Sequence, residues 1–154
     1  MTISDKSAVM QLLRNTREFK PNEIVVAEEV IDTYLHSPVD SGYYAQVAVM
    51  DSEIIGYICF GPTPLTDGAW DIYWTAVSQN HQRMGVGKAL LSYAEKQIIK
   101  ANGRIILIET SSTASYEKSR RFHITQGYEL VSQIKDFYAV GDDKLIFKKT
   151  ISSI

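Results

Sequence analysis

A strand, two glycines and a long helix follow one another in the middle of this chain. Residues 70–77 read as a buried strand, and apolar side chains then recur at helical spacing from Val86 to about Ala101, at Leu90, Leu91, Ala94 and Ile98. Gly85 and Gly87 lie at the junction. The first N–H groups of a helix have no partner within it, and the helix dipole is positive at that end. Because glycine lets the backbone approach an anion closely, this junction predicts a phosphate site.

Two better-known phosphate motifs do not match this junction. A dinucleotide-binding loop needs a third glycine where this chain has Leu90, and a Walker loop needs Ser or Thr after Lys88, where this chain has Ala89. Two glycines are also compatible with a simple tight turn, so that alternative stays open.

The order of helical and strand patterns predicts a mixed sheet. Ser4 and Pro21 are placed to open two amphipathic helices, and a fourth helix, after the central one, should run from residues 112–115 to Gln126. We expect strands at residues 43–50, 54–60, 69–77, 104–110, 128–134 and 144–149. The strand, helix, strand order at 69–110 favours a parallel pair. The prediction is an α/β (mixed α+β) fold: one mostly antiparallel sheet of about 6–7 strands, flanked by about four helices.

Two segments resemble motifs of the GNAT superfamily of N-acetyltransferases. Residues Gln82-Arg83-Met84-Gly85-Val86-Gly87 follow a strand ending in Thr75-Ala76-Val77 and show the Gln-x-x-Gly-x-Gly pattern of that family's coenzyme A loop. The later helix keeps the family's Gly-aromatic end at Gly127-Tyr128. Tyr116, Ser119 and His123 stand where the family often has Asn, Ala and Tyr. The order of elements is also that of the family, whose acyl-CoA N-acyltransferase fold is therefore implied for nearly the whole chain.

The start of the chain departs from the family pattern. Members usually begin with a short strand, but only Met1-Thr2-Ile3 precede Ser4 here. If that strand is missing, one sheet edge is open, and a partner in a homodimer could cover it.

The resemblance implies an N-acetyltransferase that moves an acetyl group from acetyl-CoA to a primary amine by direct attack in a ternary complex. It implies that the pantetheine arm pairs with the end of the third strand and that the pyrophosphate lies on the glycine turn. The implied cofactor contacts are Thr75, Ala76, Val77, Gln82, Arg83, Met84, Gly85, Val86, Gly87 and Lys88. An alternative is a catalytically impaired coenzyme A sensor or regulatory module. A third possibility is a structural or nucleotide-binding domain with an incidental glycine turn.

His123 is the first candidate for the acid that protonates the departing thiolate, because it occupies the family's tyrosine position. Proton transfer from an imidazolium of pKa about 6.5 to a thiolate of pKa about 8.5 is favourable by about 2 units, although only about a quarter of an unperturbed histidine is protonated at neutral pH. The rival donors are the phenols of Tyr116 and Tyr138, the latter in a predicted loop. A purely structural helix histidine is the remaining alternative.

Asp71 is the first candidate for the base that takes the amine proton. Strand alternation places Asp71 and Tyr73 on one face and Trp70, Ile72 and Trp74 on the other. A structural carboxylate is the alternative, and Glu109 is the second candidate base. Three other acids, Glu28, Glu29 and Asp136, could attract a cationic amine or could be solvated surface groups.

Composition narrows the class of protein and its partners. The chain has 154 residues, a formal net charge of −2 and one cysteine, Cys59, in an apolar strand. We therefore expect one domain over residues 1–154, no disulfide, a buried thiol and no nucleic-acid partner. No apolar run is long enough to cross a membrane, so we expect a cytoplasmic protein with no membrane partner. We expect no metal cofactor. The acceptor, a small-molecule or peptide amine, is not encoded in any motif.

Overall fold

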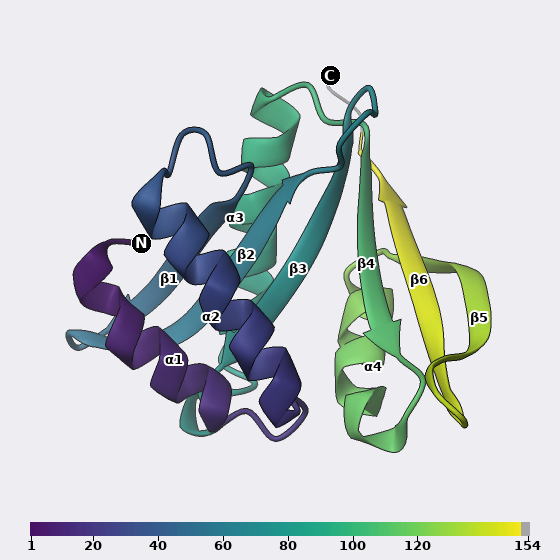
Figure 1. Cartoon of the computed structure of the whole chain (residues 1–154), viewed down its shortest axis with the longest axis horizontal. Coiled ribbons are helices and arrows are strands. Elements are labelled where there is room, and N and C mark those ends of the chain that lie inside the picture. The colour runs from purple at the N-terminus through teal and green to yellow at the C-terminus, as the bar shows by residue number, and fades with distance from the viewer. Residues whose placement is uncertain (152–154) are drawn as a thin grey trace.

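The computed structural model describes residues 1–151, in which one mixed sheet carries helices on both faces (Figure 1). Its strands are β1 (Tyr44–Met50), β2 (Glu53–Pro62), β3 (Ala69–Val77), β4 (Ile105–Ser111), β5 (Glu129–Ala139) and β6 (Asp142–Thr150). They lie in the order β1-β2-β3-β4-β6-β5. The β3–β4 pair is parallel and the other pairs are antiparallel. The predicted fold class is confirmed.

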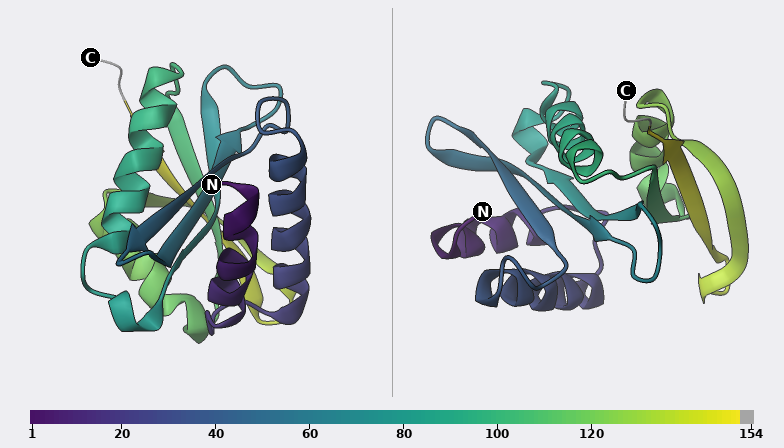
Figure 2. Two further views of the ribbon diagram at one scale, coloured as in Figure 1. Left: turned by 90° about the vertical axis from the view of Figure 1, so that its left-hand side faces the viewer. Right: turned by 90° about the horizontal axis from the view of Figure 1, so that it is seen from above.

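Helices cover both faces of the sheet (Figure 2). Helices α1 (Lys6–Arg14) and α2 (Pro21–His36) pack on one face, around a core that contains Leu13, Ile31 and the buried thiol of Cys59. Helices α3 (Val86–Lys100) and α4 (Glu117–Thr125) lie on the other face, where Ile98 and Phe147 are buried. The apolar sides of these amphipathic helices therefore pack on the faces of the sheet. Within residues 1–151, no helix is both long and apolar enough to cross a membrane.

A notch opens in the middle of the sheet, where β3 and β4 part (Figure 1). The two strands pair only from Ala69 opposite Ile105 to Ile72 opposite Ile108. The pairing of β2 with β3 shifts at the same level, because Cys59 lies opposite Trp74 whereas Phe60 lies opposite Ile72. Tyr73 is therefore an extra residue, and such a bulge bends and twists its strand. The bulge ends the β3–β4 pairing and leaves the last part of β3 free on its β4 side.

The bulge also corrects the predicted alternation of β3. Trp70 and Ile72 are buried under α3, as expected, but Trp74 packs with the α1 and α2 core on the opposite face. The extra residue at Tyr73 reverses the two-residue period from that point onward. Asp71 lies before the bulge, and its alternation with Trp70 and Ile72 places it on the face covered by α1 and α2.

The chain begins differently from the expectation. A 3₁₀ turn at Ile3–Asp5 precedes α1, and Thr2 rather than Ser4 is its first cap. The Asp5 carboxylate accepts a hydrogen bond from the Thr2 N–H at 2.7 Å, which fixes this turn. In the described part of the chain no strand precedes α1, so β1 and β5 form the sheet edges.

The last hairpin is longer than expected. Residues 136–138, predicted as a loop, belong to β5, which continues to Ala139. Asp136 adopts a positive φ of 52°, and its carboxylate accepts the Gly141 N–H at 2.7 Å. Its own N–H donates to Asp143 at 2.9 Å. These local bonds form a bulge that lets the strand bend and continue, which hydrophobic alternation alone does not reveal.

Candidate active site

The glycine turn forms a backbone concavity at the start of α3. Arg83 and Gly85 both have left-handed backbone, with φ of 63° and 81°, and α3 begins at Val86. Successive N–H groups in a turn conformation can form an anion-binding concavity. Gly85 supplies the positive φ at little cost, whereas a residue with a side chain would be strained there. The turn therefore presents free N–H groups and the positive end of a helix dipole together.

A cavity of about 450 Å³ lies against this turn. Its walls come from the free end of β3, the glycine turn, the connection between α1 and α2, and α4 with the turn before it. Among the predicted cofactor contacts, the lining residues include Thr75, Ala76, Val77, Gln82, Arg83, Gly85, Val86, Gly87 and Lys88. Met84 does not line the cavity, and its side chain is exposed. The structure thus brings together residues from both predicted cofactor segments.

The charges around the cavity favour an anion. Arg83, Lys88 and Lys118 line it, with Glu18 as the acidic lining residue. Within residues 1–151, the three cations form no ion pair with a side chain. They are therefore available to a phosphate group at the turn.

His123 lines the cavity but is buried in the α3 and α4 side of the core. Its Nε2 lies 3.2 Å from the Ser119 hydroxyl, and its Nδ1 has no hydrogen-bond partner within the described residues. Burial lowers the pKa of His123 to about 4. With that pKa only about one molecule in a thousand would carry the proton at pH 7, so burial argues against the predicted imidazolium donor.

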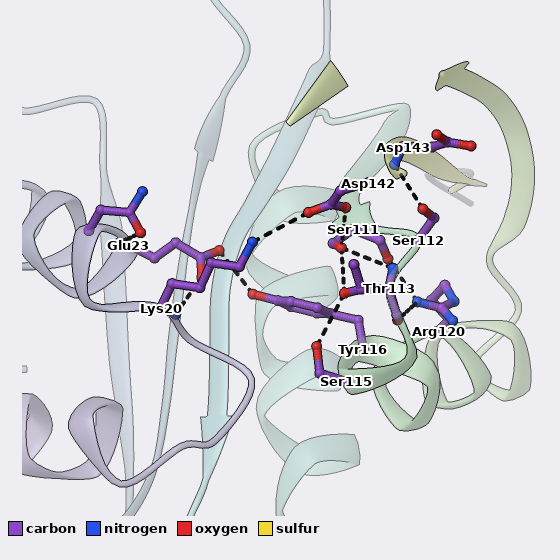
Figure 3. Close-up of polar contacts among 11 residues, drawn as sticks. Lys20, Glu23, Ser111, Ser112, Thr113, Ser115, Tyr116, Arg120, Asp142 and Asp143 are labelled. Atoms are coloured by element: carbon purple, nitrogen blue, oxygen red, sulfur yellow. Dashed lines mark hydrogen bonds and ion pairs between the residues drawn. The ribbon is translucent and has the colours of Figure 1, made fainter. Parts of the chain in front are cut away.

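Tyr116 lines the same cavity and spans the notch (Figure 3). It ends the 3₁₀ turn η3 (Ala114–Tyr116), and its hydroxyl donates to Glu23 Oε1 at 2.9 Å. The other oxygen of Glu23 accepts the Lys20 N–H at 2.6 Å. Burial, and then the charge of Glu23, raise the pKa of Tyr116 above that of an ordinary phenol. Tyr138, the other rival donor, is on β5 and does not line the cavity.

A second contact crosses the notch beside Tyr116 (Figure 3). Lys20 Nζ lies 3.4 Å from Asp142 Oδ2, and the Ser111 hydroxyl donates to Asp142 Oδ1 at 2.5 Å. Arg120 donates to the carbonyl oxygens of Ser111 and Thr113. The buried carboxylate of Asp142 therefore has two partners, and the start of α2 is joined to the end of β4.

Asp71 lies outside the cavity, on the sheet face that α1 and α2 cover. It is half-buried, and the Thr63 hydroxyl donates to its Oδ2 at 2.5 Å. Burial raises the pKa of Asp71, although the Thr63 hydrogen bond acts in the opposite direction. Glu109 shares this face and pairs with Lys144 at 2.8 Å. A half-buried carboxylate with a raised pKa is a better proton acceptor than an exposed one.

The three acids considered for amine attraction are placed away from the cavity. Glu28 pairs with Lys6 at 3.2 Å, Glu29 is exposed, and Asp136 shapes the β5–β6 turn. None of the three lines the cavity. Within residues 1–151, no group of three or more His, Cys, Asp or Glu side chains is arranged to hold a metal ion.

Comparison with known proteins agrees with this geometry. The family model for the acetyltransferase (GNAT) family matches residues 8–128. The chain belongs to the GNAT family. A Desulfovibrio desulfuricans protein, itself provisionally assigned to the GNAT acetyltransferases, is 35% identical, with a TM-score of 0.94. The match covers 97% of this chain and 94% of that one. No curated protein matches the sequence significantly.

More distant GNAT structures share the fold. An aminoglycoside 6′-N-acetyltransferase in complex with coenzyme A is 20% identical, with a TM-score of 0.76 over 98% of this chain and 93% of that one. The ribosomal-protein-S18-alanine N-acetyltransferase of Escherichia coli is 15% identical, with a TM-score of 0.76 over 99% and 91%. These proteins modify unlike acceptors, so the GNAT fold leaves the acceptor of this chain open.

Sequence reasoning on this GNAT chain missed Lys20, Glu23 and Asp142. Glu23 lies in the first turn of α2, three residues after Lys20, where an acid usually serves as a helix cap. That local signal is correct, because Glu23 does cap Lys20. Its second contact, to Tyr116, is 93 residues away and becomes visible only in the folded chain.

Proposed function

We propose that this GNAT protein is an acetyl-CoA-dependent N-acetyltransferase that acts on a primary amine. The observation that carries the proposal is the cavity that joins the glycine turn to the free end of β3. An anion site and an unpaired strand edge in one cavity suit a molecule with a pyrophosphate and an amide-containing arm. The coenzyme A complex of the similarly folded aminoglycoside acetyltransferase supports this choice of cofactor.

Coenzyme A fits the two ends of the cavity separately. The N–H groups between Arg83 and Lys88 would hold its pyrophosphate, with those two side chains adding positive charge. The backbone of residues 75–77 pairs with β2 on one side and is free on the side that faces the notch. The amides of the pantetheine arm would pair there as an added strand. The thioester would then lie in the notch.

The reaction then needs little beyond orientation and proton transfer. The neutral amine attacks the thioester carbonyl carbon, and the thiol leaves as the amide forms. In our proposal Asp71 takes the first proton from the substrate ammonium, directly or through water. Its raised pKa suits that role, and it faces the side of the notch opposite α3 and α4. One domain formed by the whole chain would carry this activity.

The test is amine-dependent release of thiol from acetyl-CoA. A panel of primary amines should include an alkyl diamine, an aminoglycoside and a peptide with an N-terminal alanine. With at least one of these amines we expect acetyl-CoA to release free thiol and the amine to gain an acetyl group, detected by mass spectrometry. The trimethylated form of the same amine is the matched control, because it cannot accept an acyl group. Tight coenzyme A binding without turnover on any amine would contradict the proposal and favour a coenzyme A sensor.

Asp71→Asn tests the proposed base. We expect kcat/KM for the amine to fall by about 100-fold at neutral pH, the usual range for loss of a general base. In the native enzyme, activity should rise with pH as Asp71 loses its proton, at a pH above that of an ordinary carboxyl group because its pKa is raised. That rise should be absent from the variant. Glu109→Gln is the control, since Glu109 is already paired with Lys144. A larger loss in Glu109→Gln than in Asp71→Asn would reverse the assignment.

The location in the cytoplasm, the homodimer, and the absence of nucleic-acid, membrane and metal partners remain predictions from the sequence.

A further inference from the structure

Inside the cavity, one phenol is available to donate a proton to the departing thiolate. Tyr116 is the only tyrosine among the described residues that line it. His123 is packed against Phe122, Tyr128 and Phe147, whose rings lie 5.7 to 6.2 Å from its own, and its burial opposes protonation. Lys118, another lining group, is exposed.

The Tyr116 hydroxyl is engaged with a carboxylate that is itself fixed. Glu23 holds the phenol through one oxygen and its own helix start through the other. Tyr116 comes from the α4 side of the sheet, while Glu23 lies on α2 over the opposite face (Figures 2 and 3). The pair therefore passes through the gap between β3 and β4 and connects the proposed cofactor side with the side where Asp71 lies.

We propose that Tyr116 and Glu23 form a relay that carries the second amine proton to the sulfur of coenzyme A. This inference rests on the proposed function and adds to it the acid of the reaction. After the N–C bond forms, the nitrogen of the tetrahedral intermediate gives a proton to the Glu23 carboxylate, directly or through water. The C–S bond breaks, the Tyr116 hydroxyl gives its proton to the sulfur, and Glu23 returns a proton to the phenol oxygen. The products are the amide and free coenzyme A thiol, and both side chains end as they began.

The hydrogen bond between Tyr116 and Glu23 sets the order of the proton transfers. While Glu23 is ionised, it accepts the Tyr116 proton and directs that proton away from the cofactor. Once Glu23 is protonated, it becomes the donor, and the phenol is free to turn its own proton toward the sulfur. A buried phenol beside a carboxylate is reluctant to ionise, so immediate return of a proton is what makes its donation feasible. Nearby charged or titratable groups are Glu18, Lys20, Tyr138 and Asp142.

A purely structural role is the main competing explanation. Tyr116–Glu23 and Lys20–Asp142 both join the start of α2 to the far side of the notch. If the bond served only to hold the two sides together, loss of the Lys20 contact should have a similar effect. Lys20→Met keeps most of the side-chain stem and removes only the charge, so it is the matched control.

The experiment compares Tyr116→Phe, Glu23→Gln, the double variant and Lys20→Met under saturating amine. We expect kcat to fall by about 100-fold or more in each single relay variant, the usual size of general acid catalysis. The KM for acetyl-CoA and the calorimetric Kd for coenzyme A should change by less than about threefold. The double variant should be no slower than the slower single variant, because members of one unit are not additive. Lys20→Met should keep kcat within about threefold. Melting temperatures measured alongside show whether each variant is folded.

The possible outcomes separate the relay from the proposed function. If the native protein turns over an amine but Tyr116→Phe and Glu23→Gln lose no more activity than Lys20→Met, the relay is wrong and the acetyltransferase stands. Losses that multiply in the double variant would also overturn the relay. If the native protein binds coenzyme A and turns over no amine, both proposals fail together.

Discussion

Gly87→Asp is expected to weaken coenzyme A binding by at least about 100-fold while leaving the protein folded. Gly87 is the second residue of α3, and a Cβ there would lie 3.4 Å from the Phe122 ring and 3.7 Å from Val77. A side chain at this position therefore enters the proposed cofactor cavity. A carboxylate about 5 Å from a phosphate charge costs about 3 kcal/mol at an effective dielectric constant of about 20. That cost corresponds to more than 100-fold in Kd.

The matched control for this prediction is Gly87→Asn, which has the same shape without the charge. We expect it to weaken binding by about tenfold or less. An acid in the first turn of a helix is favoured by the helix dipole, so Gly87→Asp should melt no earlier than Gly87→Asn. Calorimetric titration with coenzyme A measures both variants. Equal affinities for the two would place the cofactor's phosphates away from this turn.

Between pH 7 and 4, the free energy of unfolding of His123→Leu is expected to fall by about 3 kcal/mol less than that of the native protein. In the native protein the pKa of His123 is lowered to about 4, against about 6.5 in the unfolded chain. Between these values the unfolded state binds a proton that the folded state does not. The folded state therefore loses stability as the pH falls from about 6.5 to 4. The full stability that comes from neutral His123 is present above about pH 6.5. Because the side chain is only 6% exposed, little solvent screening reduces this effect.

The measurement is the free energy of unfolding by urea at several pH values from 7 to 4, for the native protein and His123→Leu. Carboxyl groups titrate in both proteins, so their shared contribution cancels in the difference. We expect the native protein to lose about 3 kcal/mol more than the variant over this range. Parallel curves would mean that His123 takes up a proton in the folded state as readily as in the unfolded one, and would restore it as a candidate imidazolium donor.

The glycine turn and the order of elements along the chain were predictable because their signals are local. Gly85 and Gly87 follow a strand and open a helix, and that spacing alone determines where the free N–H groups lie. The elements on either side of the turn could be ordered for the same reason, since each has its own hydrophobic period. The cavity then follows from packing a helix start against a strand end.

The parts that could not be predicted depend on contacts between distant strands and helices. The bulge at Tyr73 arises from the register between β2 and β3, and it alone decides that Trp74 faces α1 and α2. The burial of His123 on α4 depends in part on Phe147, which lies on β6. The contact of Tyr116 with Glu23 joins opposite faces of the sheet. Hydrophobic periodicity along the sequence does not reveal such long-range contacts, although each of them affects the chemistry of the site.

A crystal structure with coenzyme A bound tests the central claim most directly. We expect the pyrophosphate to accept hydrogen bonds from backbone N–H groups between Arg83 and Lys88, and the pantetheine amides to pair with residues 75–77. The sulfur should lie in the notch, within about 3.5 Å of the Tyr116 hydroxyl, allowing for the long reach of sulfur as an acceptor. A cofactor bound elsewhere, or a sulfur that contacts His123 and lies far from Tyr116, would contradict this account.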